Sequence, residues 1–116
     1  ILYNTRIKEI QLKFTFTSDV AQVSLDIYSP DEIIRAYYYD KMLSLKNILL
    51  TDFLPDAEYE EHYTLPEGKV VSRIYVELKN VNVYRKKDWP MVQEFLYDRM
   101  ELLELFFLEY GDVIDS

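Results

Sequence analysis

The sequence has 116 residues, 49% of them apolar and 16% aromatic, and its 13 basic and 21 acidic residues give a net charge of −8. This length and apolar content are enough for one hydrophobic core, so we expect a single domain over residues 1–116. The absence of cysteine excludes disulfides and thiolate chemistry, and the net negative charge disfavours direct binding to a nucleic acid.

The first predicted elements are two β-strands. Apolar and polar residues alternate over residues 10–16 and again over 21–27, with a polar turn at 17–19. A period of two is typical of strands with one buried face. We therefore expect an antiparallel hairpin with one apolar and one polar face.

A long helix is predicted to follow the hairpin. Ser29, Pro30 and Glu32 match a capping box with proline in the first turn. Before Pro55, apolar residues recur at helical spacing: Ile34, Tyr37, Tyr38, Met42, Leu45, Ile48 and Leu49. We expect one helix over residues 29–54, capped by the serine.

A second hairpin is predicted after this helix. Residues 58–65 and 70–78 alternate around a turn at 66–68. Glu61 falls on the apolar parity of its strand, so we expect a β-bulge or an edge position near it. The apolar residues within 81–84 either extend the fourth strand or form a short fifth one.

The last predicted element is a long helix from Asp88 to Gly111, with Trp89 and Pro90 in its first turn. We expect it to contact the sheet together with another helix or subunit, because its apolar stripe is wide: Val92, Phe95, Leu96, Met100, Leu103, Phe106, Phe107 and Tyr110. The elements together predict an α+β fold in the order ββαββ(β)α. Two long helices would pack on one face of an antiparallel sheet of four or five strands.

Several stretches, spread over nearly the whole chain, have the residues of one family: Tyr3-Asn4-Thr5, Leu43-Ser44-Leu45-Lys46, Ser72 to Leu78, Asn80 to Tyr84, Asp88-Trp89-Pro90 and Leu102 to Phe107. In these stretches the chain resembles the domain of unknown function 4268, a family of bacteria and archaea. Members usually begin with a further aromatic-bearing helix, so the resemblance implies that this chain lacks an N-terminal helix of the family.

The resemblance also implies a cellular context. Members stand alone or are attached to domains that look like restriction-type nucleases, which suggests a link to DNA restriction and modification systems. The family has no established activity, so the resemblance supplies no catalytic residue.

One set of residues matches the loose PD-(D/E)XK signature of metal-dependent nucleases: Asp56 after Pro55, then Glu77 and Lys79. In that chemistry two carboxylates hold Mg²⁺, which activates water, while the lysine orients the nucleophile. Asp56 would lie opposite or diagonal to Glu77 if the second hairpin pairs their faces. The signature is short enough to arise by chance. The alternative is that Asp56 only follows a helix-ending proline, while Glu77 and Lys79 are solvated sheet residues that pair with neighbours such as Arg73.

Two further clusters of titratable residues are candidates for function. His62 is the sole histidine, and a regular strand would point it the same way as Glu58 and Glu60, as a metal site or acid-base pair requires. A solvated surface histidine is the alternative. The basic run over residues 85–87 is too short for a nucleic-acid site and favours a solvated loop.

The eleven tyrosines include the run Tyr37-Tyr38-Tyr39. On a helix these three span about 200°, so at least one should leave the core. Exposed tyrosine is typical of protein interfaces, but a buried ring with its hydroxyl in water is equally consistent.

Two functions follow as hypotheses. The first is a non-catalytic interaction module, without catalytic residues, metal or cofactor, that engages a partner or a second copy through its helical aromatic surface or its polar sheet face. This hypothesis predicts that Phe107→Ala disrupts assembly. The alternative is a Mg²⁺-dependent nuclease that uses Asp56, Glu77 and Lys79. No apolar run approaches the ~20 residues of a membrane-spanning helix and no targeting signal is present, so we expect a cytoplasmic protein.

Overall fold

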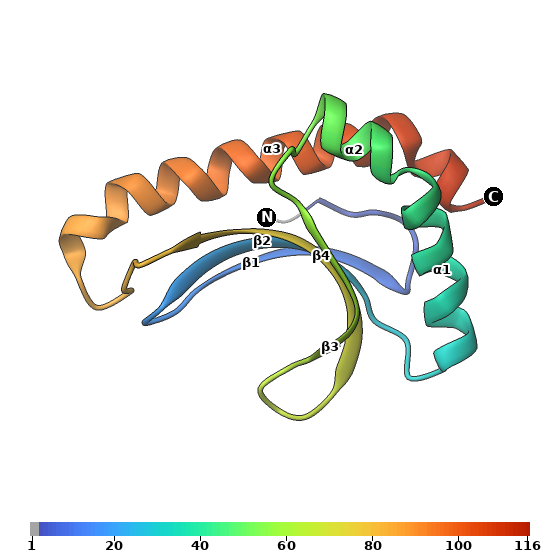
Figure 1. Ribbon diagram of the computed structural model, residues 1–116, viewed down its shortest axis with the longest axis horizontal. Helices are drawn as coiled ribbons and strands as arrows, with labels where there is room; N and C mark the ends of the chain where they lie inside the picture. Colours follow the sequence, from blue (N-terminus) through green and yellow to red (C-terminus); the bar gives the residue numbers. More distant parts are fainter. Residues whose placement is uncertain (1–2) are drawn as a thin grey trace.

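The computed structural model describes residues 3–116, and within them the α+β class is confirmed. The described chain has four strands and three α-helices in the order β-β-α-α-β-β-α, and Figure 1 shows how they are arranged. The elements are β1 (Ile10–Phe16), β2 (Val20–Ile27), α1 (Glu32–Ser44), α2 (Lys46–Asp52), β3 (Glu58–Thr64), β4 (Val70–Lys79), a 3₁₀ turn η1 (Lys86–Asp88) and α3 (Trp89–Ile114).

The two predicted hairpins are confirmed, and they join into one sheet in the order β1-β2-β4-β3. All neighbouring strands are antiparallel. The central pair, β2 and β4, comes from different hairpins and sets Leu25 opposite Ile74 on one face and Asp26 opposite Arg73 on the other. β1 and β3 are the two edge strands, so each has one side without a strand partner in the described chain.

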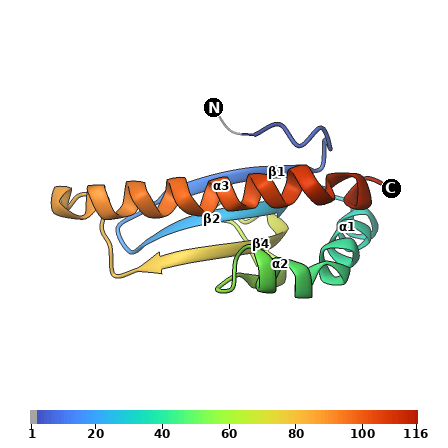
Figure 2. The same ribbon diagram turned by 90° about the horizontal axis from the view of Figure 1, so that it is seen from above.

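α3 contacts β1, β2 and β4 of the sheet. Figure 1 shows α3 running along the sheet, α2 beside the C-terminal half of α3, and α1 at one end. Seen from above in Figure 2, α3 lies along β1 and β2, while α1 and α2 lie toward the other side. The sheet arches away from α3, so its opposite face is concave, and in the described chain no helix covers that face.

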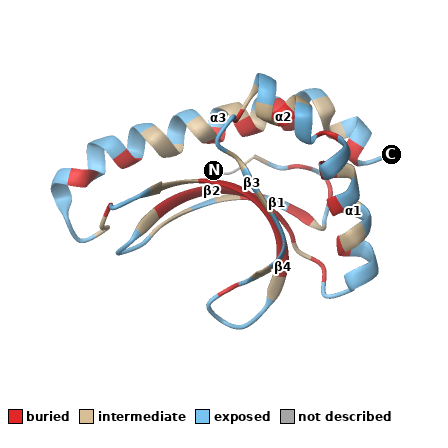
Figure 3. Ribbon diagram, in the orientation of Figure 1, coloured by how far each residue is buried: buried red, intermediate tan, exposed pale blue. Residues whose placement is uncertain are grey.

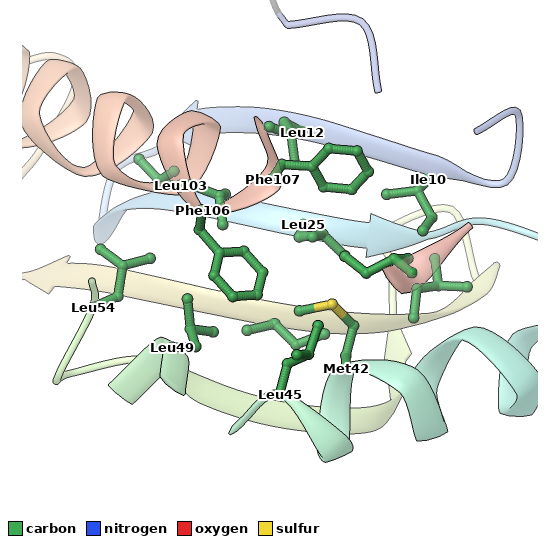
Figure 4. Close-up of a cluster of buried hydrophobic side chains, with 14 of the residues drawn as sticks. Ile10, Leu12, Leu25, Met42, Leu45, Leu49, Leu54, Leu103, Phe106 and Phe107 are labelled. Carbon is green, nitrogen blue, oxygen red and sulfur yellow. The ribbon is translucent and has the colours of Figure 1, made fainter. Parts of the chain in front are cut away.

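The core lies between the sheet and the helices, where the buried residues in Figure 3 concentrate. Figure 4 shows side chains from the first hairpin, from all three helices and from the chain next to α2 meeting there: Ile10, Leu12, Leu25, Met42, Leu45, Leu49, Leu54, Leu103, Phe106 and Phe107. Ile74 and Val76 of β4 belong to the same cluster. The expectation that the last helix contacts the sheet and another helix is confirmed, because the ring of Phe106 lies 5.3 Å from that of Phe53, which ends α2. Phe107 packs against Tyr3 instead, at 6.0 Å.

The single helix predicted over residues 29–54 is wrong, because the chain forms α1 and α2 with a break at Leu45 (φ −99°, ψ 3°). At the break, the carbonyl of Met42 accepts hydrogen bonds from the Leu45 N–H and from the Tyr59 hydroxyl, which replace the helical bond that it would otherwise make. Leu45, at the break, and Leu49 of α2 are both buried in the core.

The predicted serine cap is also displaced. Asp31 caps α1, with its carboxylate accepting the N–H of Ile33 at 2.9 Å. Ser29 accepts the N–H of Asp31 at 3.1 Å, so it shapes the turn that precedes the cap. Glu32 occupies the first helical position instead of completing a capping box.

The segment after β4 and the C-terminal end of α3 also differ from the prediction. A fifth strand does not form within the described chain, because Asn80 adopts a left-handed conformation (φ 62°) and the following residues turn, which buries Val81 against Ala21 and Val92. At the other end, α3 continues past Gly111 to Ile114, whose side chain is fully buried in the core. The stop at Gly111 was therefore three residues early, and burial of Ile114 accounts for the extra turn.

Candidate functional site

A buried ion pair lies at the centre of the concave sheet face. Nε and Nη2 of Arg73 donate to the two carboxylate oxygens of Asp26 at 2.7 and 2.8 Å. Only 4% of Arg73 and 0% of Asp26 is exposed. Burial by itself lowers the pKa of Arg73, but the hydrogen bond and charge of Asp26 more than offset it, so the pKa is raised. The guanidinium therefore stays charged inside the sheet.

The ion pair belongs to a chain of hydrogen bonds that reaches Glu77. Nη1 of Arg73 donates to Oε1 of Gln22 at 3.0 Å, and Nε2 of Gln22 donates to Glu77 at 2.9 Å. Lys13 of β1 adds a second cation, 3.6 Å from Asp26. The sequence predicted a polar face but not this network, because the network depends on the pairing of β2 with β4, whose paired residues are 45 to 59 positions apart in the sequence.

Tyrosines border the network on the β3 side. The guanidinium of Arg73 lies 4.2 Å from the ring centre of Tyr63, and the hydroxyl of Tyr75 donates to Glu60 at 2.6 Å. Burial, followed by the hydrogen bond and charge of Glu60, raises the pKa of Tyr75 above its usual value. Each charged group named here has a partner within the cluster, so the geometry favours a structural role for the concave face over a catalytic one.

The structure brings together only two of the three residues of the nuclease signature. The amine of Lys79 lies 3.6 Å from the carboxylate of Glu77 at the end of β4. Asp56 lies in the turn between α2 and β3, where its carboxylate is 3.8 Å from Arg99 of α3, on the helix side of the sheet. Glu77 instead points to the concave face, where it binds Gln22.

No group of three or more histidine and carboxylate side chains in residues 3–116 is arranged to hold a metal ion. The carboxylate of Asp56 lies beside Arg99 of α3. The carboxylate of Glu77 contacts Gln22 and Lys79, so the two carboxylates have different partners. The nuclease remains an untested hypothesis, and this arrangement does not favour it.

The cluster predicted around His62 does not form, because a β-bulge intervenes. The bulge near Glu61 is confirmed as a register shift between Glu60 and Tyr63. One extra residue reverses the alternation. Tyr63 therefore joins the concave face beside Arg73, while His62 leaves the face of Glu60 and lines a pocket next to α1.

The tyrosine run divides as expected, since one of its members leaves the core. Tyr39 is buried, Tyr38 is half-buried and Tyr37 is exposed. The hydroxyl of Tyr37 donates to the backbone carbonyl of Ser116 at 2.7 Å, and Lys41 binds the same carbonyl, so this tyrosine fastens α1 to the C-terminus.

The basic run before α3 is partly engaged within the chain. Arg85 donates to Asp88 at 2.8 Å and to the carbonyl of Asn80 at 3.2 Å. Asp88 thus closes the turn before α3 through Arg85 and the N–H of Asn82, and makes no side-chain hydrogen bond as a helix cap. Lys86 and Lys87 are exposed, as a solvated loop predicts.

An apolar groove lies between β1 and α3, at the edge of the sheet. Its volume is about 420 Å³. Phe14 forms its floor from β1, and the remaining lining comes from α3: Gln93, Leu96, Tyr97, Met100, Glu101 and Glu104. Phe14 is 50% exposed, although Leu12, two residues earlier on the same face of β1, is 2% exposed. Sequence alternation assigned Phe14 to the core and so missed this site.

The family described as "Domain of unknown function (DUF4268)" matches residues 1–111, so the chain belongs to this family. No curated protein and no solved structure matched it. No helix in residues 3–116 is long and apolar enough to cross a membrane.

Proposed function

We propose that this DUF4268 member is a non-catalytic interaction module, and that it binds a basic amphipathic helix of a partner in the groove between β1 and α3. The observation that carries this proposal is the exposure of Phe14. A phenylalanine on the inner face of a sheet loses about 1 kcal/mol or more of burial free energy when half of it stays in water. A partner that covers Phe14 recovers this free energy on binding.

The shape of the groove favours a helix as the occupant. A helix with its side chains is about 10 Å wide. The groove lies between α3 and β1 and leaves half of Phe14 uncovered, so a helix lying against α3 at the β1 edge would cover this ring. Such a helix would place apolar residues three and four positions apart against Phe14, Leu96 and Met100.

The charge of α3 favours a basic partner. Of its charged residues, one is basic, Arg99, and six are acidic: Glu94, Asp98, Glu101, Glu104, Glu109 and Asp112. Glu101 and Glu104 line the groove itself. A second copy of this chain would bring another acidic α3 to the same place, which disfavours self-association through this surface. Lysine or arginine beside the apolar stripe of a partner would instead meet charges of opposite sign.

The resemblance to the family suggests which partner to test first. The resemblance to a family found with restriction-type nucleases suggests an attached or co-expressed domain of that class, which supplies the basic helix. In this proposal the chain contributes assembly to a DNA-processing system and performs no chemistry of its own.

The test uses three synthetic peptides of about 18 residues, or five helical turns. One is an amphipathic leucine-lysine helix, the second replaces each lysine with glutamate, and the third is a scrambled leucine-lysine sequence. NMR titration of the chain should show saturable shifts around Phe14, Tyr97 and Met100 with the first peptide alone, and binding should weaken as salt is added. Equal binding of the glutamate peptide, or shifts elsewhere on the surface, would refute the proposal.

A matched pair of variants locates the interaction. Tyr97→Ala is expected to weaken binding of the leucine-lysine peptide about tenfold, as truncation of an aromatic anchor does. Leu108→Ala removes a comparably exposed side chain from α3 outside the groove and should leave the affinity unchanged. An equal effect of the two variants would mean that the peptide binds α3 without using the groove.

A further inference from the structure

A second pocket lies at the opposite edge of the sheet, between the start of α1 and the β3–β4 hairpin. Its volume is about 490 Å³, and its lining comes from three segments: Pro30, Glu32, Arg35, His62, Lys69 and Val70. Three of these six side chains are basic or can become so, in a chain whose net charge is −8. The groove described above lies beside β1, and this pocket lies beside β3.

Arg35 is the least ordinary residue of the pocket. Its guanidinium carries a positive charge, yet only 6% of the residue is exposed to water. Its Nη1 donates to the carbonyl of Ser29 at 2.6 Å, but its Nε–H is buried and has no acceptor among residues 3–116. A buried donor without an acceptor costs about 1–3 kcal/mol, and more when it is charged. Within the described chain, Nε of Arg35 is the one buried side-chain nitrogen or oxygen without a hydrogen-bond partner.

The nearest carboxylate does not neutralise Arg35 well. Oε1 of Glu32 lies 4.0 Å from Nη2, beyond hydrogen-bond distance, and the side chain of Glu32 is 85% exposed. A pair of this kind contributes at most about 1 kcal/mol. Arg73 shows the contrast, because Asp26 gives that guanidinium two short hydrogen bonds inside the sheet. Arg35 therefore lacks the counter-ion that a buried arginine normally has.

Two further donors stand at the mouth of the pocket. Lys69 lies in the β3–β4 turn, with its ammonium 4.0 Å from the ring centre of Tyr28, so its position is held by a cation–π contact. His62 is exposed and was turned to this side by the β-bulge. The pocket thus gathers a guanidinium, an ammonium and an imidazole from α1, the hairpin turn and β3.

We propose that this pocket binds a phosphate group, with Arg35 as the principal ligand and Lys69 and His62 completing the site. A phosphate dianion takes several charged donors arranged around it, and its charge offsets that of the buried guanidinium. Glu32 competes with the anion for Arg35, so it lowers the affinity. The shared chemistry is the phosphate group, either as the free ion or on a small ester such as a nucleoside monophosphate.

The experiment is an NMR titration of the chain with inorganic phosphate and, separately, with 5′-AMP, with chloride and acetate as controls at matched ionic strength. Both phosphate ligands should produce saturable shifts of the amides of Arg35, His62, Lys69 and Val70. Shifts with AMP alone would mean that the nucleoside, and not the phosphate group, is recognised, which overturns the proposal. Equal shifts with chloride or acetate would overturn it as well, because they would show unselective attraction of anions.

Substitutions of opposite sign sharpen the test. Lys69→Ala should weaken phosphate binding about two- to fivefold, and Glu32→Ala should strengthen it by a similar factor, since each removes one exposed charge near Arg35. Lys87→Ala, which removes an exposed lysine from η1, is the matched control and should change nothing. Arg35→Met should abolish binding. If that variant fails to fold, the opposite effects of Lys69→Ala and Glu32→Ala still decide, and the same effect from Lys87→Ala would refute the site.

Discussion

Arg73 and Asp26 face each other across the two central strands and share two short hydrogen bonds in the interior of an otherwise open sheet face. The pair joins the two hairpins at β2 and β4, which are remote in sequence. Because a misaligned register would leave both charges buried without partners, the pair also selects the register that the chain adopts.

The first prediction concerns this pair. Asp26→Ala should lower the free energy of unfolding by about 3–5 kcal/mol, because it leaves the Arg73 guanidinium buried without a counter-ion. Urea unfolding of the variant measures the loss. The double variant Asp26→Leu with Arg73→Met should be less destabilised than Asp26→Ala, since no charge then remains to be desolvated. A loss below about 1 kcal/mol in Asp26→Ala would show that water reaches the pair.

The second prediction concerns stability at high pH. Burial and the Glu60 carboxylate raise the pKa of Tyr75 above its usual value of 10.0, and burial raises those of Tyr38, Tyr39 and Tyr59. Above pH 10 the unfolded chain therefore loses these protons before the folded chain does. The resulting stability is fully present below pH 10 and is lost as the pH rises, by up to about 1.4 kcal/mol per pH unit for each tyrosine.

Urea unfolding between pH 8 and 11 checks the sign and the size of this effect. Tyr75→Phe should make the fall of the unfolding free energy with pH shallower, because phenylalanine has no hydroxyl proton to lose. It should also cost about 1.5–3 kcal/mol at neutral pH through the lost hydrogen bond to Glu60. Tyr84→Phe, at an exposed position, is the control and should follow the parent curve. A decline that Tyr75→Phe leaves unchanged would contradict the assignment.

The third prediction separates the interaction module from the nuclease. Thermal unfolding with millimolar Mg²⁺ or Mn²⁺ should show no rise of several degrees in the parent chain, because Asp56 and Glu77 bind different partners on different sides of the sheet. Glu77→Ala should lower the melting temperature equally with and without the metal. A metal-dependent rise in the parent that Glu77→Ala and Asp56→Ala both remove would favour the nuclease instead.

Much of the fold could be predicted from local patterns. Alternation located both hairpins, and the acidic residue on an apolar parity located the bulge near Glu61. The break at Leu45 could not be predicted, because it depends on the hydroxyl of Tyr59, 14 residues later, reaching the carbonyl of Met42. The fifth strand failed for a local reason, the left-handed conformation of Asn80, to which asparagine is well suited.

The candidate sites were less predictable because they depend on contacts between distant segments. The predicted apolar stripe included Ile34, but Ile34 is exposed, whereas its neighbour Arg35, which the stripe did not include, is buried. The pairing of His62 with Glu60 failed because one extra residue in the bulge reversed the alternation. Phe107, expected at an assembly surface, is a core residue packed on Tyr3, so Phe107→Ala would destabilise the chain itself.

The fourth prediction compares two residues on the same face of β1. Leu12→Ala should cost about 2–5 kcal/mol of unfolding free energy, because the side chain is fully buried and its loss leaves a cavity. Phe14→Ala should cost about 1 kcal/mol despite the larger side chain, since half of the ring is already in water and solvent fills the space it leaves. The same substitution should weaken binding of the basic helical peptide about tenfold, because the ring forms the floor of the groove. Urea unfolding and peptide titration of the two variants measure both effects.

If Phe14→Ala lost as much stability as Leu12→Ala and kept full affinity for the peptide, Phe14 would be an ordinary core residue, and the groove would no longer be a credible docking surface.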